Sequence, residues 1–164
     1  MDRLEIRGER TSDIAEIRGI NLAAFPTPGE ADLVDQLRRS GSAMYSLVAV
    51  AEERLVGHVM LSRMQSPERS LGLAPVAVLE AHRGRGIASK LIAEALSQAK
   101  SDGWKSVFVL GGPYYKRFGF DPLLAAKFSS PYAGPHFMAL ELQEGALAAQ
   151  AGSTRYAQAF EDLG

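Results

Sequence analysis

The stretch VAVLEAHRGRGIASKLIAEAL, residues 76–96, joins an apolar run to a helical pattern through the loop Arg83-Gly84-Arg85-Gly86. Apolar residues after the loop recur at the spacing of an amphipathic helix, which we predict from about Gly86 to Ser101. The almost wholly apolar run Leu71–Leu79 predicts a strand buried on both faces, and Ser106–Leu110 predicts the next strand. These elements form one crossover unit with two parallel strands and a right-handed connection.

The loop before this helix has the chemistry of an anion site. The first turn of a helix presents unpaired N–H groups and a partial positive charge, and the segment from His82 to Gly86 offers no good side-chain cap. Gly84 and Gly86 allow close approach to the backbone, while Arg83 and Arg85 add donors suited to phosphate oxygens. The plain alternative is a surface loop with two solvated arginines. The nucleotide motifs GxxxxGK[ST] and GxGxxG are absent.

The rest of the chain predicts alternating strands and helices. Alternation at 4–7 predicts a half-buried strand, and helical spacing predicts helices over 14–25 and 30–39. Residues 46–62 read as a hairpin around the turn Glu52-Glu53-Arg54, and 137–142 as a strand. The alanine-rich residues 143–164 read as a helical or loosely attached tail. Pro75 is unexpected within a strand, since proline cannot donate to a ladder.

Composition limits the class of protein. The 164 residues are 46% hydrophobic and 23% charged, which predicts a single globular domain over residues 1–164. A net charge of -1 gives no general attraction for nucleic acid or an anionic membrane. The chain has no cysteine, which excludes disulfides, thiolate metal sites and a cysteine nucleophile and suits the cytoplasm. We expect no metal and no membrane partner.

Two segments together resemble a known family. Arg83-Gly84-Arg85-Gly86-Ile87-Ala88 resembles the R/Q-x-x-G-x-G/A acyl-CoA signature of the GNAT superfamily of N-acetyltransferases. Tyr115 to Phe120 is similar to the recurring Y-x-x-x-G-F segment of that family. The order of elements agrees, and the specific match over 73–120 resembles the small bacterial branch called YhbS-like.

The resemblance implies a fold and a co-substrate site. The implied fold is α/β (α+β), with a mixed sheet of about six or seven strands, a splayed parallel pair and about four flanking helices. Acetyl-CoA would be the acyl donor, with its pyrophosphate on the loop amides and its pantetheine arm along the preceding strand. The break at Pro75 would open the ladder for that arm. The implied cofactor-binding residues are Val76, Ala77, Val78, Arg83, Gly84, Arg85, Gly86, Ile87, Ala88 and Ser89.

The implied reaction is direct transfer of the acetyl group to a primary amine of a small molecule or a protein. Tyr115 matches the family's general acid by position, although a packing role stays open, and Tyr114 would face packing or the ligand rim. Expected acceptor-binding residues are Asn21, Phe25, Glu30 and His58.

Several points stay open at this stage. Candidates for the general base are Glu30, Glu52, Glu53, His58 and Glu80. Gly111-Gly112-Pro113 stands where many family members carry an asparagine that helps to hold the pantetheine arm. A non-catalytic acyl-CoA sensing module on the same fold is the alternative function. The identity of the acceptor and the choice between a monomer and a homodimer are undetermined.

Overall fold

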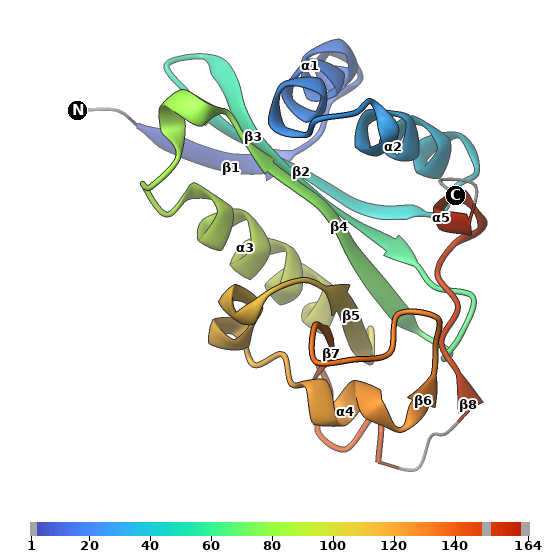
Figure 1. Ribbon diagram of the computed structural model, residues 1–164. Helices are drawn as coiled ribbons and strands as arrows, with labels where there is room; N and C mark the ends of the chain where they lie inside the picture. The colour runs from blue at the N-terminus through green and yellow to red at the C-terminus, as the bar shows by residue number, and fades with distance from the viewer. Residues whose placement is uncertain (1–2, 149–151, 162–164) are drawn as a thin grey trace.

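The computed structural model describes residues 3–148 and 152–161 of the chain (Figure 1). The helices are α1 (Ile14–Ala24), α2 (Gly29–Arg39), α3 (Ile87–Ser101), α4 (Pro122–Ala126) and α5 (Gln158–Glu161), with 3-10 turns η1 (Thr11–Asp13), η2 (Glu80–His82) and η3 (Pro113–Phe118). The strands are β1 (Leu4–Gly8), β2 (Ala43–Ala51), β3 (Arg54–Arg63), β4 (Ser70–Val78), β5 (Ser106–Leu110), β6 (Phe128–Ser129), β7 (Phe137–Glu141) and β8 (Gly152–Ser153). Within this described part, no helix combines the length and apolarity that crossing a membrane requires.

The main sheet has six strands in the order β1-β2-β3-β4-β5-β7, and β6 pairs with β8 in a small separate sheet. Within the main sheet β4 and β5 run parallel, whereas all other neighbours are antiparallel. This arrangement confirms the predicted mixed fold. The β2–β3 turn lies where expected, with Glu52 and Glu53 both at positive φ, as a tight hairpin turn requires.

The parallel pair separates after a short ladder. Only Ser70–Gly72 of β4 pairs with β5, opposite Ser106–Phe108, although β4 continues to Val78. The register between β3 and β4 shifts between the pairs Val59–Val76 and Leu61–Leu73, on the side away from β5. Pro75 therefore coincides with an irregularity toward β3, and the opening toward β5 begins before it. The expected splay is present, but the proline is not where it starts.

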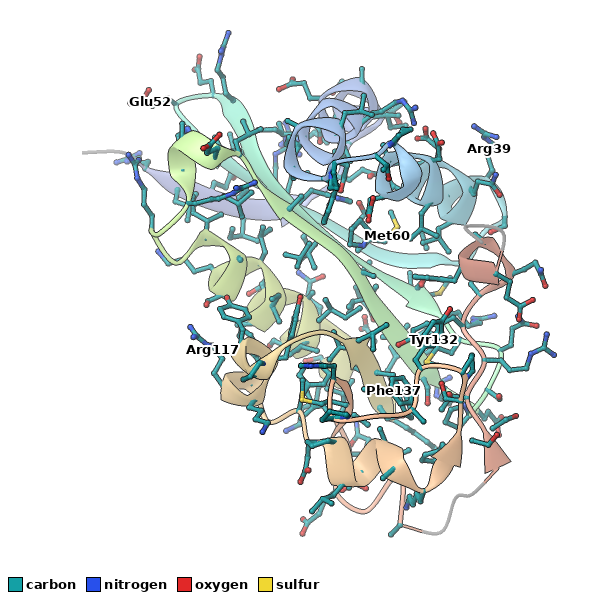
Figure 2. The ribbon with its side chains drawn as sticks, viewed as in Figure 1. Arg39, Glu52, Met60, Arg117, Tyr132 and Phe137 are labelled. Atoms are coloured by element: carbon teal, nitrogen blue, oxygen red, sulfur yellow. The ribbon has the colours of Figure 1, made fainter. Side chains whose placement is uncertain are left out.

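The sheet separates two helical layers. Helices α1 and α2 cover one face, and α3 covers the other (Figure 1). Along β3 the side chains alternate between these layers: Val59 packs in the cluster with α3, whereas Met60 points toward α1 and α2 (Figure 2). The apolar stripe predicted for α3 is buried throughout, at Ile87, Leu91, Ile92, Ala95, Leu96 and Ala99.

The expectation for the C-terminal tail was wrong in its described part. Only Gln158–Glu161 is helical there, and the tail is attached to the sheet rather than loose. Arg155 exchanges backbone hydrogen bonds with the β3–β4 loop at Gln65 and Ser66. The Tyr156 ring lies so close to β4 that a Cβ added at Gly72 would sit 2.7 Å from it. Residues 149–151 and 162–164 lie outside the described part of the chain.

Candidate active site

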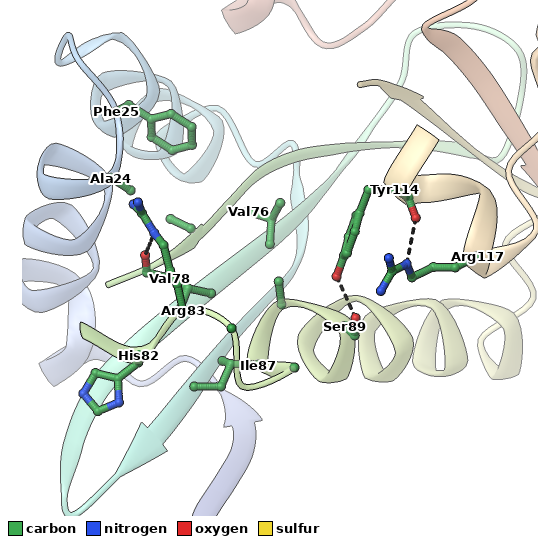
Figure 3. A pocket seen from close by; sticks show the side chains of 14 residues that line it. Ala24, Phe25, Val76, Val78, His82, Arg83, Ile87, Ser89, Tyr114 and Arg117 are labelled. Atoms are coloured by element: carbon green, nitrogen blue, oxygen red, sulfur yellow. Dashed lines mark hydrogen bonds between the residues drawn. The ribbon is translucent and has the colours of Figure 1, made fainter. Parts of the chain in front are cut away.

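A cleft of about 560 Å³ lies where the end of β4, the loop before α3 and η3 face one another (Figure 3). Its walls come from four parts of the chain: the end of α1, the last residues of β4, the α3 loop and η3. The lining residues are Ala24, Phe25, Val76, Ala77, Val78, His82, Arg83, Gly84, Gly86, Ile87, Ala88, Ser89, Tyr114 and Arg117.

The loop closes this cleft with an uncapped helix start. Gly84 and Gly86 both adopt left-handed backbone conformations, with φ of 78° and 75°. No side chain caps α3, and its first helical bond runs from the Lys90 N–H to the Gly86 carbonyl. The N–H groups of the first turn therefore have no helical acceptor, and they face a space that a phosphate oxygen can fill.

The charged side chains on the cleft are cationic. Arg83 donates from Nε to the Val78 carbonyl at 3.1 Å, so its guanidinium lies across the end of β4 (Figure 3). Arg117 places its guanidinium 4.0 Å from the centre of the Tyr114 ring and donates to the Tyr114 carbonyl. His82 adds a third basic group. With no carboxylate among the described residues that line it, the cleft favours an anion.

The edge of β4 on this side is free of β5. The Leu79 N–H donates to Val56 on the β3 side. Since backbone groups alternate in direction along a strand, those of Val76 and Val78 point to the opposite side, where β5 has diverged. The Val78 carbonyl accepts a hydrogen bond from Arg83, which agrees with this direction. A linear ligand with amide groups can therefore extend β4 as an added strand.

A second pocket of about 400 Å³ adjoins the cleft, and Phe25 and Val76 line both. Its walls are mostly apolar and aromatic, and they include residues from the C-terminal tail. The lining residues are Phe25, Glu30, Leu33, Leu73, Ala74, Pro75, Val76, Leu110, Tyr115, Tyr132, Tyr156 and Phe160.

The two neighbouring tyrosines of η3 serve different pockets. Tyr114 lines the cleft, and its hydroxyl lies 2.6 Å from the Ser89 hydroxyl on α3. Tyr115 lines the second pocket, and burial raises the pKa of its phenol above the usual 10.0, so the group keeps its proton. A Cβ added at Gly111 would collide with the Tyr115 ring. The glycine at this position therefore makes room for the tyrosine.

Two expected acceptor residues lie elsewhere, which corrects the prediction for Asn21 and His58. Both side chains are fully buried and line neither pocket. The Asn21 amide lies 3.3 Å from His58 Nδ1, and the Ser46 hydroxyl lies 2.9 Å from His58 Nε2. Burial lowers the pKa of His58 to about 4, which keeps its ring neutral at pH 7. Ser46 bonds in turn to Glu9, whose carboxylate is paired with Arg38.

The other sequence-predicted residues come together. All ten expected cofactor-binding residues except Arg85 line the cleft, and Phe25 and Glu30 line the second pocket. The sequence reasoning missed Ala24, His82 and Arg117 on the cleft, and Tyr132, Tyr156 and Phe160 on the second pocket. The position of Arg117 could have been predicted, because it follows Tyr114 by three residues in a helical turn and so lies on the same side of that turn. Residues 3–148 and 152–161 contain no group of three His, Cys, Asp or Glu residues that could hold a metal ion.

Comparison with known proteins gives consistent matches. The model of the acetyltransferase (GNAT) family matches residues 14–120. The uncharacterized N-acetyltransferase YjhQ of Escherichia coli strain K12 is 37% identical over 134 residues, which cover 76% of this chain and 74% of that protein.

Two solved structures match nearly the whole chain. The crystal structure of the GNAT family N-acetyltransferase YhbS from Escherichia coli in complex with CoA has a TM-score of 0.92 and 31% identity, covering 99% of this chain and 94% of that one. A GNAT family acetyltransferase from Brucella melitensis in complex with acetyl-CoA has a TM-score of 0.82 and 32% identity, covering 96% and 98%.

Proposed function

The chain belongs to the acetyltransferase (GNAT) family, and we propose that it transfers the acetyl group of acetyl-CoA directly to a primary amine across the junction of the two pockets. The observation that carries this proposal is the open edge of β4, which leads directly to the uncapped start of α3. An extended chain with an anionic group at one end fits that groove, and CoA has this form.

The cleft residues would hold the donor. The amides from Gly84 to Ser89 would bind the diphosphate, with Arg83 and Arg117 adding charge. The backbone of Val76 and Val78 would pair with the pantetheine amides. This arrangement would bring the thioester to Val76, the part of β4 that both pockets share.

The second pocket would hold the acceptor. A neutral amine attacks the thioester carbonyl, so the C–N bond forms, the carbonyl oxygen gains negative charge and the C–S bond then breaks. The attacking nitrogen gives up one proton to water, and the departing thiolate takes one proton from an acid. The Tyr115 phenol supplies this second proton in our proposal, since its raised pKa keeps the group protonated and it lies on the acceptor side of Val76.

The wider setting is proposed from the sequence. We propose that residues 1–164 form one acetyltransferase domain that works in the cytoplasm, without nucleic acid, membrane or metal. The absence of cysteine and the net charge of -1 support this setting. Static light scattering distinguishes a monomer from a homodimer.

Calorimetry and thiol release test the proposal together. We expect acetyl-CoA to bind with one site per chain, and CoA thiol to be released when an acceptable amine is added. Desulfo-CoA should compete with acetyl-CoA and give no product. Binding without thiol release, across amines, amino acids, aminoglycosides and peptides, would make the protein a sensor rather than an enzyme.

A further inference from the structure

We infer that the acceptor is a primary amine that binds with a single positive charge on an apolar or aromatic body. Glu30 receives its ammonium group, which loses a proton to water before the nitrogen attacks. The inference rests on the proposed function and adds the chemical class of the acceptor to it. The observations behind it are an unpaired carboxylate oxygen and a group of aromatic rings in the second pocket.

Glu30 is a half-buried acid, and one of its two carboxylate oxygens lacks a partner. It lies in the first turn of α2 and lines the second pocket. Its Oε1 atom is buried and has no hydrogen-bond partner. By contrast, Asp32 and Asp35 of the same helix form ion pairs with Arg18 at 2.9 and 2.7 Å. Because an unpaired buried carboxylate oxygen costs stability, Glu30 is set to receive a donor from outside the chain.

Aromatic rings line the same pocket as Glu30. Tyr132, Tyr156 and Phe160 form a contiguous group, with ring centres 5.7 Å apart for the first pair and 4.9 Å for the second. Phe25 and Tyr115 complete the aromatic part of the wall. Ring faces attract ammonium groups and also accept apolar bodies, so one wall serves both halves of such a ligand.

The charges on the pocket exclude other classes of amine. Glu30 is the one acid among the described residues that line the pocket, and no lysine, arginine or histidine is among them. An amino acid would bring its carboxylate to a wall without a cation, and an aminoglycoside would bring several charges to one acid. Leu110 is 51% exposed and lines the same pocket, which leaves apolar surface for the body of the ligand.

A matched panel in thiol-release assays tests the class of acceptor. The probes are 2-phenylethylamine, phenylalanine, an aminoglycoside and a lysine-containing peptide, each with saturating acetyl-CoA. We expect kcat/KM for 2-phenylethylamine to exceed the others by at least about 10-fold, because they lose the apolar contacts or bury an unpaired charge. A preference for phenylalanine, the aminoglycoside or the peptide would overturn the inference and leave the proposed function standing.

Variants separate Glu30 from its neighbours. In Glu30→Gln we expect KM for 2-phenylethylamine to rise about 10- to 100-fold, with affinity for acetyl-CoA within about 2-fold of wild type. The control Glu16→Gln removes an exposed acid from α1 and should change neither value. Equal KM values for Glu30→Gln and wild type would remove Glu30 from the inference and so refute it.

A binding readout keeps the inference testable without turnover. Protonated N,N-dimethyl-2-phenylethylamine keeps one N–H donor but cannot form a stable amide, and calorimetry on the complex with CoA should show that this cation binds at least about 10-fold tighter than 2-phenylethanol. Binding of this cation with no thiol release from any amine would refute the proposed function and support the pocket assignment. Equal affinity for the cation and the alcohol would refute the pocket assignment.

Discussion

The two pockets that meet at Val76 differ in what they present to a ligand. The cleft offers backbone N–H groups, glycines and the basic side chains of His82, Arg83 and Arg117. The second pocket offers aromatic rings and one carboxylate, that of Glu30. Their opposite charges suit the two ligands that we propose, a polyanionic donor and a cationic acceptor.

This contrast shows how one sheet can bind two unlike molecules close together. The cleft uses main-chain groups, whose positions follow from the αL glycines and the start of α3. The second pocket uses side chains that come from distant parts of the sequence. Changes to the cleft should therefore act on donor binding, and changes to the second pocket on acceptor binding or on chemistry.

The largest effect should come from reversing the charge of the cleft. Gly86→Glu places a carboxylate beside the diphosphate site and should weaken CoA binding by more than about 100-fold. Gly86→Ala meets no neighbouring atom within 4 Å but is strained at φ +75°, so it should lose only about 10-fold. Calorimetry with CoA measures both, and similar losses for the two variants would count against an anion site.

The buried histidine His58 lies outside both pockets, so its protonation should change the stability of the fold without changing ligand binding in either pocket. His58 has a folded pKa of about 4, below the usual 6.5, so the unfolded chain binds the extra proton first. Stability should therefore fall as pH drops from about 6.5 to about 4, by up to about 3 kcal/mol. Urea unfolding at pH 7 and pH 4.5 measures the loss, and NMR titration of His58 near 6.5 would contradict its cause.

Exchanging the two tyrosines for phenylalanine separates chemistry from binding. Tyr115→Phe removes the proposed acid and should lower kcat by about 100-fold, with CoA affinity nearly unchanged. Tyr114→Phe removes the hydroxyl beside Ser89 and should lower CoA affinity with kcat nearly intact. Steady-state rates and calorimetry give both values. The assignment fails if Tyr115→Phe retains the wild-type kcat.

A pair of adjacent glycines tests how Tyr115 is positioned. Gly111→Ala adds a Cβ that collides with the Tyr115 ring and should lower kcat by about 10-fold through displacement of the phenol. Gly112→Ala meets no atom within 4 Å and has a φ of -84°, so it should behave as wild type. Equal rates for the two variants would show that the ring adjusts without cost.

The smallest effect should distinguish the two loop arginines. Arg83 lines the cleft and Arg85 does not, so Arg83→Gln should weaken CoA binding about 5-fold and Arg85→Gln less. The Arg83→Gln loss should shrink at high salt, because ions screen an exposed charge. Calorimetry with CoA at two salt concentrations checks this ranking. A larger loss of CoA affinity in Arg85→Gln than in Arg83→Gln would contradict it.

Local patterns predicted the donor side well. The strand, glycine loop and helix over 71–101 are adjacent in sequence, so their pattern predicts an uncapped helix start after a buried strand. The groove beside the strand was expected from the resemblance to the GNAT family. The sequence did not show which side chains of β3 face which helical layer, because both faces of this strand are apolar. His58 lies on the face toward α1, beside Asn21, and a shift of one residue would place it on the face toward α3.

The acceptor side depended on contacts between distant residues. Tyr156 reaches β4 because Gly72 leaves space for its ring, and neither residue signals the other in the sequence. Tyr132 stands in a segment without helical or strand pattern, and its place by the tail is visible only in three dimensions (Figure 2). Sequence reasoning could therefore name Phe25 and Glu30 from the α1–α2 connection, but not the opposite wall.

The attachment of the tail to the sheet has a consequence for engineering. The shared family match ends at residue 120, yet Tyr132, Tyr156 and Phe160 follow it and line the second pocket. All residues that line the cleft therefore precede Phe120, whereas one wall of the second pocket is encoded after it. A chimaera that takes everything after Phe120 from a relative should still bind acetyl-CoA but should change its preference among amine acceptors.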